Sequence, residues 1–305
     1  MKIAVVGCGA MGSLYAALLA SAGNDVWAID VDAAQIQAMQ RDGLHVSGAS
    51  GARTVRLNAT TDPSEPGPCE FVVIATKAMH VATAAASAQP LVGRDTVVLT
   101  IQNGLGSAEK VCAALGGAHV AIGVAGGFGS ELQRPGRIHH NGWELIRLGE
   151  SDGPVTPALA AVAEVWRAAG FRVQAYDDIQ RMIWEKLICN VCFSGTCALT
   201  ELTIGEVMAT PDAWQVALGC AVEAHAVALA RGVQLSFVDP VAHVMEFGRT
   251  IPGARPSMLL DHLARRRAEV DAINGAIPPA ARACGLEAPV NEVVTALLKA
   301  KETQF

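Results

Sequence analysis

The sequence has no excess of positive charge. Its 305 residues include 23 lysines and arginines against 29 aspartates and glutamates, a formal net charge of −6. This balance gives no general attraction to nucleic acid or to an anionic membrane surface. The one dense basic run, Arg265-Arg266-Arg267, is expected on a solvated helix face. We therefore expect neither nucleic acid nor membrane among the partners of this chain.

Long apolar runs are also missing. No uninterrupted apolar stretch reaches the roughly eighteen residues that a membrane-spanning helix needs. Met1 leads almost at once into a strand-like run, which does not fit the charged and then apolar order of a secretory leader. The sequence contains no internal repeat and no low-complexity tract. We expect a globular, cytoplasmic protein that is long enough for two domains.

The eight cysteines form no metal-ligand pattern. Their apolar surroundings are typical of free buried thiols in a reducing compartment. One C-x-x-C spacing, Cys189 to Cys192, could form a redox pair, but no second pair completes a zinc site. His139 and His140 are adjacent on an expected strand and therefore point to opposite faces. We expect no metal site.

The first thirty residues carry the most informative pattern. The sequence begins with an apolar run over 3–6, which predicts a strand. A glycine-rich turn follows, and then an Ala/Leu-rich segment that predicts a helix. A second apolar run ends on Asp30. Gly7 permits the tight turn, Gly9 lets a pyrophosphate approach the backbone, and Gly12 allows close helix packing. The helix N-terminus adds free N–H groups and a positive dipole end. Ordinary packing glycines are the alternative. The predicted dinucleotide site consists of Gly7, Gly9, Ala10, Met11, Gly12 and Asp30.

Strand and helix patterns alternate up to about Tyr176, which is typical of a doubly wound α/β sheet. Apolar runs 71–76 and 96–100 predict buried parallel strands, and 43–57 predicts a hairpin. From Ile179 onward nearly every segment has a helical pattern. We therefore expect a dinucleotide-binding domain over 1–177 and an all-helical domain over 178–305. Further expected elements are helices over 33–41, capped by Asp32, 79–88 and 154–169, and strands over 143–148 and 171–176.

Polar side chains follow the two central strands. Lys77 comes directly after the first, and Asn103 follows the second. Ligands in open α/β sheets collect beyond the carboxyl ends of strands, so both residues are candidate ligand contacts. Turn chemistry is the alternative for Asn103, because Asn-Gly favours left-handed backbone.

Three further candidates lie in the helical half. Lys186 and Asn190 share one face of an apolar helix. Partial desolvation there would lower the pKa of the lysine toward the range useful for proton transfer, or the lysine stem is buried and its ammonium reaches water. Ser257 is expected as the N-cap of a helix that continues through 265–275. Glu269 on that helix either has a functional role or pairs at the surface with a neighbouring arginine.

Together these motifs resemble the ketopantoate reductase (2-dehydropantoate 2-reductase) family over the whole chain. The resemblance implies a Rossmann-type N-terminal domain, a helical C-terminal domain, and hydride transfer from NAD(P)H to a 2-oxo acid, giving a D-2-hydroxy acid. The segments that carry it are Gly7-x-Gly9-Ala10-Met11-Gly12, Thr76-Lys77-Ala78, Gln102-Asn103-Gly104, Trp184-x-Lys186-x-x-x-Asn190, Ser257-Met258-x-x-Asp261 and Glu269-x-Asp271-x-x-Asn274-Gly275.

The resemblance also implies residue roles. Lys186 would be the general acid that protonates the carbonyl oxygen, and Glu269 would bind substrate and orient Lys186. Asn103 would contact nicotinamide or substrate. The remaining implied roles are substrate binding by Asn190 and Ser257 and a place beside the cofactor and the substrate carboxylate for Lys77.

Two departures from the family pattern change the expected ligands. Pantoate-making members usually carry asparagines where this chain has Ser194 and Ile204, so a less hydroxylated 2-oxo acid is expected. Those members also prefer NADP and place a basic residue where Asp30 stands. A carboxylate accepts a hydrogen bond from the ribose 2′-OH and repels a 2′-phosphate, so we expect a preference for NAD.

Two other functions fit the same fold. One is an NAD-dependent dehydrogenase that oxidises a 2-hydroxy acid or an alcohol in a catabolic pathway. The other is a non-catalytic nucleotide-binding regulator, against which the combination of Lys186, Asn190 and Glu269 argues. The apolar C-terminal helices are compatible with a homodimer and equally with a monomeric core.

Overall fold

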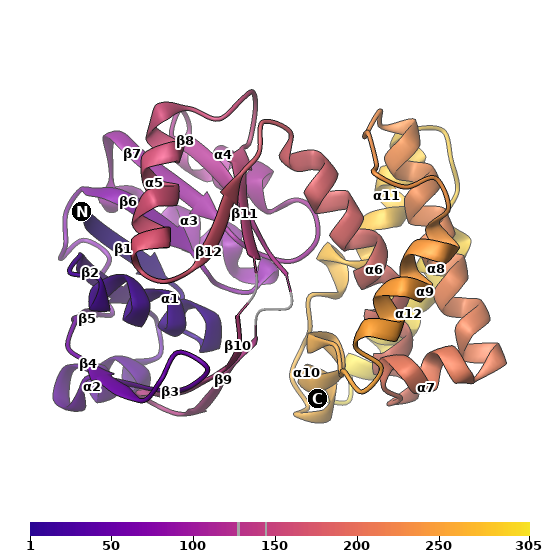
Figure 1. The fold of residues 1–305 in the computed structure, drawn as a ribbon, viewed down its shortest axis with the longest axis horizontal. Coiled ribbons are helices and arrows are strands. Elements are labelled where there is room, and N and C mark those ends of the chain that lie inside the picture. The colour runs from indigo at the N-terminus through magenta and orange to yellow at the C-terminus, as the bar shows by residue number, and fades with distance from the viewer. Residues whose placement is uncertain (127–128, 144) are drawn as a thin grey trace. The chain divides into compact units, whose positions relative to one another are not determined.

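The computed structural model describes residues 1–126, 129–143 and 145–305, and the chain divides into two compact units (Figure 1). The first unit contains Met1–Gln102 and Ser107–Ile179. The second contains Asn103–Gly106 and Gln180–Phe305. A four-residue segment from the middle of the α/β half therefore belongs to the helical unit. The strand expected over 143–148 includes Glu144, which lies outside the described residues.

An eight-stranded sheet forms the centre of the first unit, in the order β12-β11-β8-β7-β6-β1-β2-β5. Neighbouring strands are parallel except for the antiparallel pair β8 and β11. The strands are β1 (Lys2–Val6), β2 (Asp25–Ile29), β5 (Asn58–Thr60), β6 (Cys69–Ile74), β7 (Val92–Thr100), β8 (His119–Ala125), β11 (Leu145–Glu150) and β12 (Arg172–Ala175).

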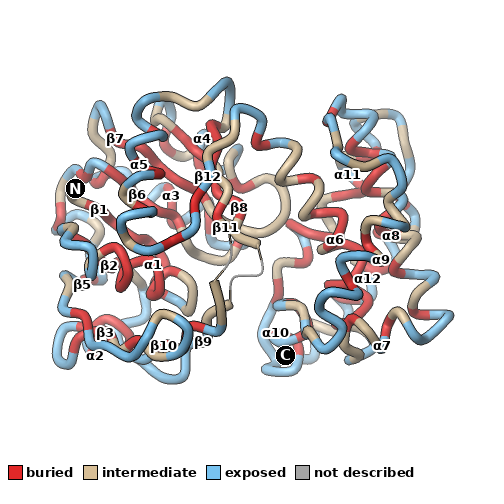
Figure 2. Tube along the Cα trace, in the orientation of Figure 1, coloured by how far each residue is buried: buried red, intermediate tan, exposed pale blue. Residues whose placement is uncertain are grey.

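Helices pack on both faces of this sheet because its strand residues alternate between two cores. Ile3 and Val5 belong to one core with α1 and α5, whereas Ala4 and Val6 belong to the other with α3 and α4. Figure 2 shows the central strands as buried. The predicted doubly wound sheet is confirmed. The helices are α1 (Ala10–Ser21), α2 (Ala33–Asp42), α3 (Val81–Ser87), α4 (Ser107–Leu115) and α5 (Pro157–Ala168), with 3-10 turns η1 (Ala78–His80) and η2 (Gln89–Leu91).

A second, four-stranded sheet has the order β4-β3-β10-β9 and packs against α1. The expected hairpin is confirmed, because β3 (Leu44–Gly48) and β4 (Arg53–Val55) pair antiparallel. Strand β3 also pairs in parallel with β10 (Arg137–Gly142), which in turn pairs with β9 (Gly129–Arg134). No local sequence pattern indicates the β3–β10 pairing, because its partners lie about ninety residues apart.

The second unit is helical, and its longest helix, α6, runs through the core. Trp184, Ile188 and Val191 of α6 are each at most 1% exposed. This confirms the predicted all-helical half. The elements are α6 (Ile179–Thr200), α7 (Ile204–Ala209), α8 (Pro211–Ala230), α9 (Pro240–Thr250), α10 (Ser257–Leu263), η3 (Val270–Ala272), η4 (Asn274–Ala276), α11 (Ile277–Ala283) and α12 (Pro289–Glu302).

The structure corrects two local predictions in this unit. The helix expected to continue through 265–275 ends at Leu263, because Arg265 adopts a left-handed backbone (φ 51°) and two 3-10 turns follow. Ser257 is the first residue of α10 and not its N-cap, which is Pro256. Pro278 and Pro279 lie in the first turn of α11, where proline is tolerated.

Among the described residues, helix α8 is long and apolar enough to cross a membrane by length and composition alone, although no uninterrupted apolar run within it reaches eighteen residues. One such helix is weak evidence, because core helices of globular proteins meet the same criterion. Cys220, Ala221 and Ala224 of α8 are fully buried in the core of the second unit. One face of the helix therefore packs in this core, while Val216, Val222 and Leu229 on other faces are exposed.

Candidate active site

The three glycines between β1 and α1 have the different environments that a dinucleotide-binding turn requires. Gly7 has φ +94° and touches Thr76, while a Cβ on Gly12 would lie 1.8 Å from the Gly7 carbonyl oxygen. A Cβ on Gly9 would meet no atom within 4 Å. Space is therefore open only beside the glycine over which a pyrophosphate would pass, so the turn fits a dinucleotide.

Side chains hold the peptide groups of Cys8 in this turn. The Cys8 N–H donates to an Asp30 carboxylate oxygen, and the other Asp30 oxygen accepts from the Asp32 N–H at 2.9 Å. The Cys8 carbonyl accepts from Ser13 Oγ at 2.7 Å and from Gln35 Nε2 at 3.0 Å. Asp30 thus supports the turn, and each carboxylate oxygen can accept a second hydrogen bond.

The carboxyl ends of β6 and β7 are joined by Gln102. Its Nε2 donates to the carbonyl oxygens of Ile74 at 2.7 Å and Thr76 at 3.0 Å. Lys77 follows at the N-cap of η1 and is half-buried. The sequence motif contained Gln102 without indicating this role.

Lys186, Asn103 and Glu269 meet in the second unit. Lys186 Nζ donates to Asn103 Oδ1 at 2.6 Å, and Asn103 Nδ2 donates to Glu269 Oε2 at 3.4 Å. Because the amide nitrogen faces the carboxylate, the amide oxygen must face the ammonium. All three residues are half-buried. The structure therefore joins three candidates that the sequence separates by more than 160 residues.

Backbone contacts hold Asn103 at this place. Gly104 has φ +87°, and a Cβ there would lie 1.9 Å from the carbonyl oxygen of Ala272. The Leu105 N–H donates to that same oxygen at 2.9 Å. Segment 103–106 is thus attached to η3, which begins directly after Glu269. The turn chemistry of Asn-Gly and the placement of the Asn103 side chain act together.

Two buried asparagines fix the segment around Glu269 on α6. Asn274 is fully buried, and its Nδ2 donates to the carbonyl oxygen of Val191 at 2.9 Å and to Asn291 Oδ1 at 3.0 Å. Gly195 allows this approach, because a Cβ there would lie 2.8 Å from Asn274 Oδ1. These contacts explain the Asn-Gly pair that follows Glu269 in the sequence motif.

The remaining substrate candidates are less constrained. Asn190 is half-buried one turn after Lys186, and among the described residues its side chain has no hydrogen-bond partner. Ser194 follows one turn later at 4% exposure, and Ile204 is a core residue of α7 at 3%. Ser257 is exposed. In the part of the chain that the structure describes, none of these side chains is hydrogen-bonded to the Lys186–Asn103–Glu269 group.

The cysteines do not form a reactive pair. Cys189 and Cys192 are free and buried in α6. Burial raises the pKa of Cys189 to about 12 and holds that of Cys192 well above the usual value, so both are thiols at neutral pH. Over residues 1–126, 129–143 and 145–305, no group of three His, Cys, Asp or Glu residues could hold a metal ion.

Two family models match this chain and show which protein family it belongs to. The model described as Ketopantoate reductase PanE/ApbA matches residues 3–153, and its C-terminal counterpart matches residues 178–302. The chain belongs to the ketopantoate reductase family. The predicted family is therefore confirmed.

Relatives of this ketopantoate reductase family member match along nearly the whole chain. The 2-dehydropantoate 2-reductase of Archaeoglobus fulgidus is 31% identical over 306 residues, covering 99% of this chain and 98% of the relative. The structure of a PanE/ApbA family ketopantoate reductase from Ralstonia eutropha has a TM-score of 0.92 at 30% identity, covering 100% and 99% of the two chains. A D-mandelate dehydrogenase solved with NADH and anilino(oxo)acetate has a TM-score of 0.90 at 26% identity, with the same coverage.

The environments of Gly9 and Gly12 predict that alanine at one position affects cofactor binding and alanine at the other affects stability. Gly9→Ala should leave the thermal unfolding temperature nearly unchanged and raise the Kd for the nicotinamide dinucleotide roughly tenfold or more, because its methyl group occupies the open space. Gly12→Ala should lower the unfolding temperature by several degrees, because its Cβ collides with the Gly7 carbonyl. Calorimetry with and without the nicotinamide dinucleotide measures both effects. Unchanged binding of the dinucleotide in Gly9→Ala would contradict the predicted cofactor contact.

Proposed function

We propose that this member of the ketopantoate reductase family reduces the ketone of a 2-oxo acid with a nicotinamide cofactor, using Lys186 as the proton donor. The contact that carries the proposal is the hydrogen bond from Lys186 Nζ to Asn103 Oδ1, with Asn103 held in turn by Glu269. A half-buried ammonium with a fixed orientation suits proton donation to a carbonyl oxygen.

The chemistry at Lys186 follows from the charge that reduction creates. Hydride addition to a ketone carbon places negative charge on its oxygen, and a positioned ammonium stabilises that charge and supplies the proton. An ammonium has three N–H donors, so its bond to Asn103 is compatible with donation to a substrate oxygen. Glu269 fixes the amide of Asn103 and thereby helps to orient Lys186. The side chain of Asn190, one turn along α6, would bind a polar group of the substrate.

The first unit would hold the cofactor at Gly7, Gly9, Ala10, Met11 and Gly12, with Lys77 as a further contact. When bound, the reduced nicotinamide supplies the hydride. The first N–H groups of α1 lack acceptors within the helix and would bind the pyrophosphate. The open space beside Gly9 supports this assignment.

We propose NADH as the preferred cofactor. Asp30 directly follows β2, and its carboxylate accepts hydrogen bonds from the N–H groups of Cys8 and Asp32, so its charge stays at the expected ribose position. A fixed carboxylate there repels a 2′-phosphate. The structural relative D-mandelate dehydrogenase was solved with NADH, which agrees with this preference.

We propose a substrate with fewer hydroxyl groups than 2-dehydropantoate. Ser194 stands at the third position of the helix face that carries Lys186 and Asn190, and it is shorter than the family's usual asparagine. Ile204, where the family usually has another asparagine, is buried in the apolar core. The metabolic pathway of the protein sets the physiological direction of the reaction. Oxidation of a 2-hydroxy acid in a catabolic pathway would use the same residues. A purely regulatory role is not favoured by the assembled Lys186–Asn103–Glu269 group.

Lys186→Ala tests the proton donor. The substitution should lower kcat by about 10²–10⁴-fold, the usual contribution of a general acid, and leave the Kd for NADH nearly unchanged. Lys301→Ala is the matched control, because Lys301 donates to Ala198 and Glu201 at the far end of α6. Stopped-flow turnover and fluorescence titration separate the two quantities. Full turnover in Lys186→Ala would remove Lys186 from this role.

Asp30→Asn tests the cofactor preference while retaining an oxygen that accepts the Cys8 N–H. Wild-type protein should show a higher kcat/KM with NADH than with NADPH. The variant should narrow that preference by about tenfold, because repulsion of the 2′-phosphate is lost. Asp62→Asn, in the turn after β5, should not change the ratio. A wild-type preference for NADPH would overturn the proposal.

A matched pair of substrates tests the substrate class. The ketone 3,3-dimethyl-2-oxobutanoate is 2-dehydropantoate without its hydroxyl. A site that binds a hydroxyl rejects the analogue lacking it by about 10⁴–10⁵-fold, whereas a site without such groups discriminates by about 10²-fold or less. We expect the second behaviour in initial-rate measurements of kcat/KM. A preference above 10⁴ for 2-dehydropantoate would refute the substrate proposal alone, and reduction of no 2-oxo acid with either cofactor would refute the function.

A further inference from the structure

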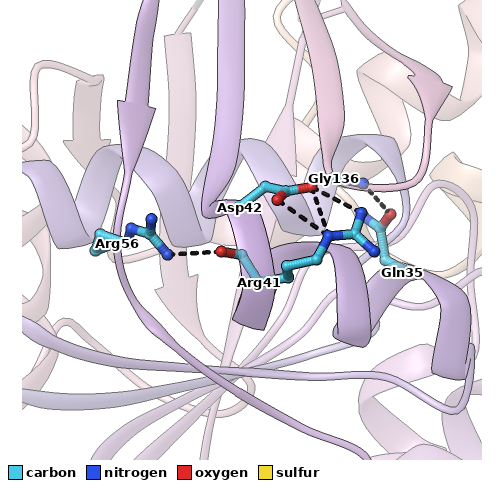
Figure 3. A network of polar contacts seen from close by, with 5 residues as sticks. All are labelled: Gln35, Arg41, Asp42, Arg56 and Gly136. Atoms are coloured by element: carbon cyan, nitrogen blue, oxygen red, sulfur yellow. Dashed lines mark hydrogen bonds and ion pairs between the residues drawn. The ribbon is translucent and has the colours of Figure 1, made fainter.

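Gln35 is a buried polar residue for which the sequence analysis assigned no role. It lies in the first turn of α2, next to the N-cap Asp32, and is 1% exposed. Its Nε2 donates to the Cys8 carbonyl oxygen at 3.0 Å and to Ser13 Oγ at 3.0 Å. Its Oε1 accepts from the Gly136 N–H at 2.8 Å (Figure 3). Both amide hydrogens and one acceptor position of this side chain are therefore used.

The contacts of Gln35 at the turn form a closed triangle. Ser13 Oγ donates to the same Cys8 carbonyl oxygen that accepts from Gln35, at 2.7 Å, and also accepts from Gln35. On the other side of the residue, the Cys8 N–H donates to Asp30. The peptide groups on both sides of Cys8 are thus held by side chains. Cys8 itself is 1% exposed.

The peptide that Gln35 holds is the one directly before Gly9. Glycine has no Cβ to restrict its backbone, so Gly9 by itself would let the following amide groups rotate away from a ligand. Fixing the Cys8 carbonyl removes that freedom at the start of α1. A binding site that is ordered before its ligand arrives loses less entropy when it binds.

The third contact of Gln35 leads to the small sheet. Gly136 forms the turn between β9 and β10, and its carbonyl oxygen accepts from the His45 N–H of β3 at 2.9 Å. One side chain therefore connects the glycine-rich turn to a sheet whose strands come from distant parts of the chain. The small sheet gives Gln35 a fixed support.

We propose that Gln35 is a positioning residue for the cofactor: it orders the Cys8–Gly9 peptide so that the first N–H groups of α1 bind the pyrophosphate of the dinucleotide. This inference rests on the nucleotide binding proposed above. It goes beyond that proposal by assigning part of the cofactor affinity to a side chain that makes no contact with the predicted phosphate position other than through the turn.

Gln35→Met tests the inference, because methionine has a similar length and no hydrogen-bonding amide. The Kd for NADH should rise roughly tenfold, as expected for the loss of a buried hydrogen bond that preorganises the site. At saturating NADH, kcat and the KM for the 2-oxo acid should stay within twofold of wild type. The increase in unfolding temperature that saturating NADH produces in wild type should become smaller at equal NADH concentration.

Two further variants distinguish positioning from stability. Gln40→Met is the matched control on the same helix, since Gln40 Nε2 donates to the Ala59 carbonyl at 2.8 Å and has no contact with the turn. It should leave the Kd for NADH unchanged. Ser13→Ala removes two of the three hydrogen bonds of the triangle and leaves the bond from Gln35 to the Cys8 carbonyl oxygen. It should raise that Kd by about two- to fivefold, and it carries the test if Gln35→Met does not fold.

Three results would decide against the inference. The first is a lower unfolding temperature of Gln35→Met with an unchanged Kd for NADH, which would indicate a structural role alone. The second is an equal rise in Kd for Gln40→Met. The third is an unchanged Kd in Ser13→Ala when Gln35→Met is unfolded. Failure of wild-type protein to bind NADH would contradict the proposed function itself, so the two failures are distinguishable.

Discussion

The hydrogen bond between Lys186 and Asn103 is the interaction on which the candidate site depends. An ammonium that is not oriented has many rotamers and contributes little to proton transfer. Here Asn103 fixes the ammonium, and Glu269 fixes the amide of Asn103. Each of these three groups comes from a different segment of the chain. Two further contacts support that arrangement. Gly104 lies close to the backbone of Ala272, and the buried side chain of Asn274 donates to the Val191 carbonyl oxygen of α6.

Sequence patterns predicted the larger elements because those elements follow strong physical periodicities. Alternation in β1, the continuous apolar run of β6 and the helical second half were all recovered. The prediction of a continuous helix around Glu269 was wrong, because Arg265 adopts a left-handed backbone conformation that ends the helix favoured by the composition. The β3–β10 pairing was missed, because pairing between distant strands leaves no local signal. Strand ends and helix positions indicated the candidate residues, and the family resemblance supplied their roles. No local pattern showed that Asn103 faces Lys186.

The glycine-rich turn shows how one residue serves two purposes. The sequence pattern predicts that Asp30 discriminates between a ribose 2′-hydroxyl and a 2′-phosphate. In the structure its carboxylate also accepts hydrogen bonds from the N–H groups of Cys8 and Asp32. Gln35 and Ser13 complete the same support from the opposite side. Gln35 is a polar residue at a buried position of α2, which is unusual for a glutamine. A polar residue in the first turn of a helix is also typical of ordinary capping, so the sequence alone could not identify the Cys8 carbonyl as the partner of Gln35.

Segment 103–106 has a consequence for how such a protein is built. Because Asn103 leaves the α/β unit to join the helical one and the chain then returns, the helical unit cannot be excised as a contiguous piece with its Lys186 partner intact. Exchange of whole C-terminal halves between homologues would transplant a lysine and leave behind the amide that orients it. Recombination at a single junction near residue 179 therefore separates Lys186 from its own Asn103, and Ala272 from the segment that packs on it.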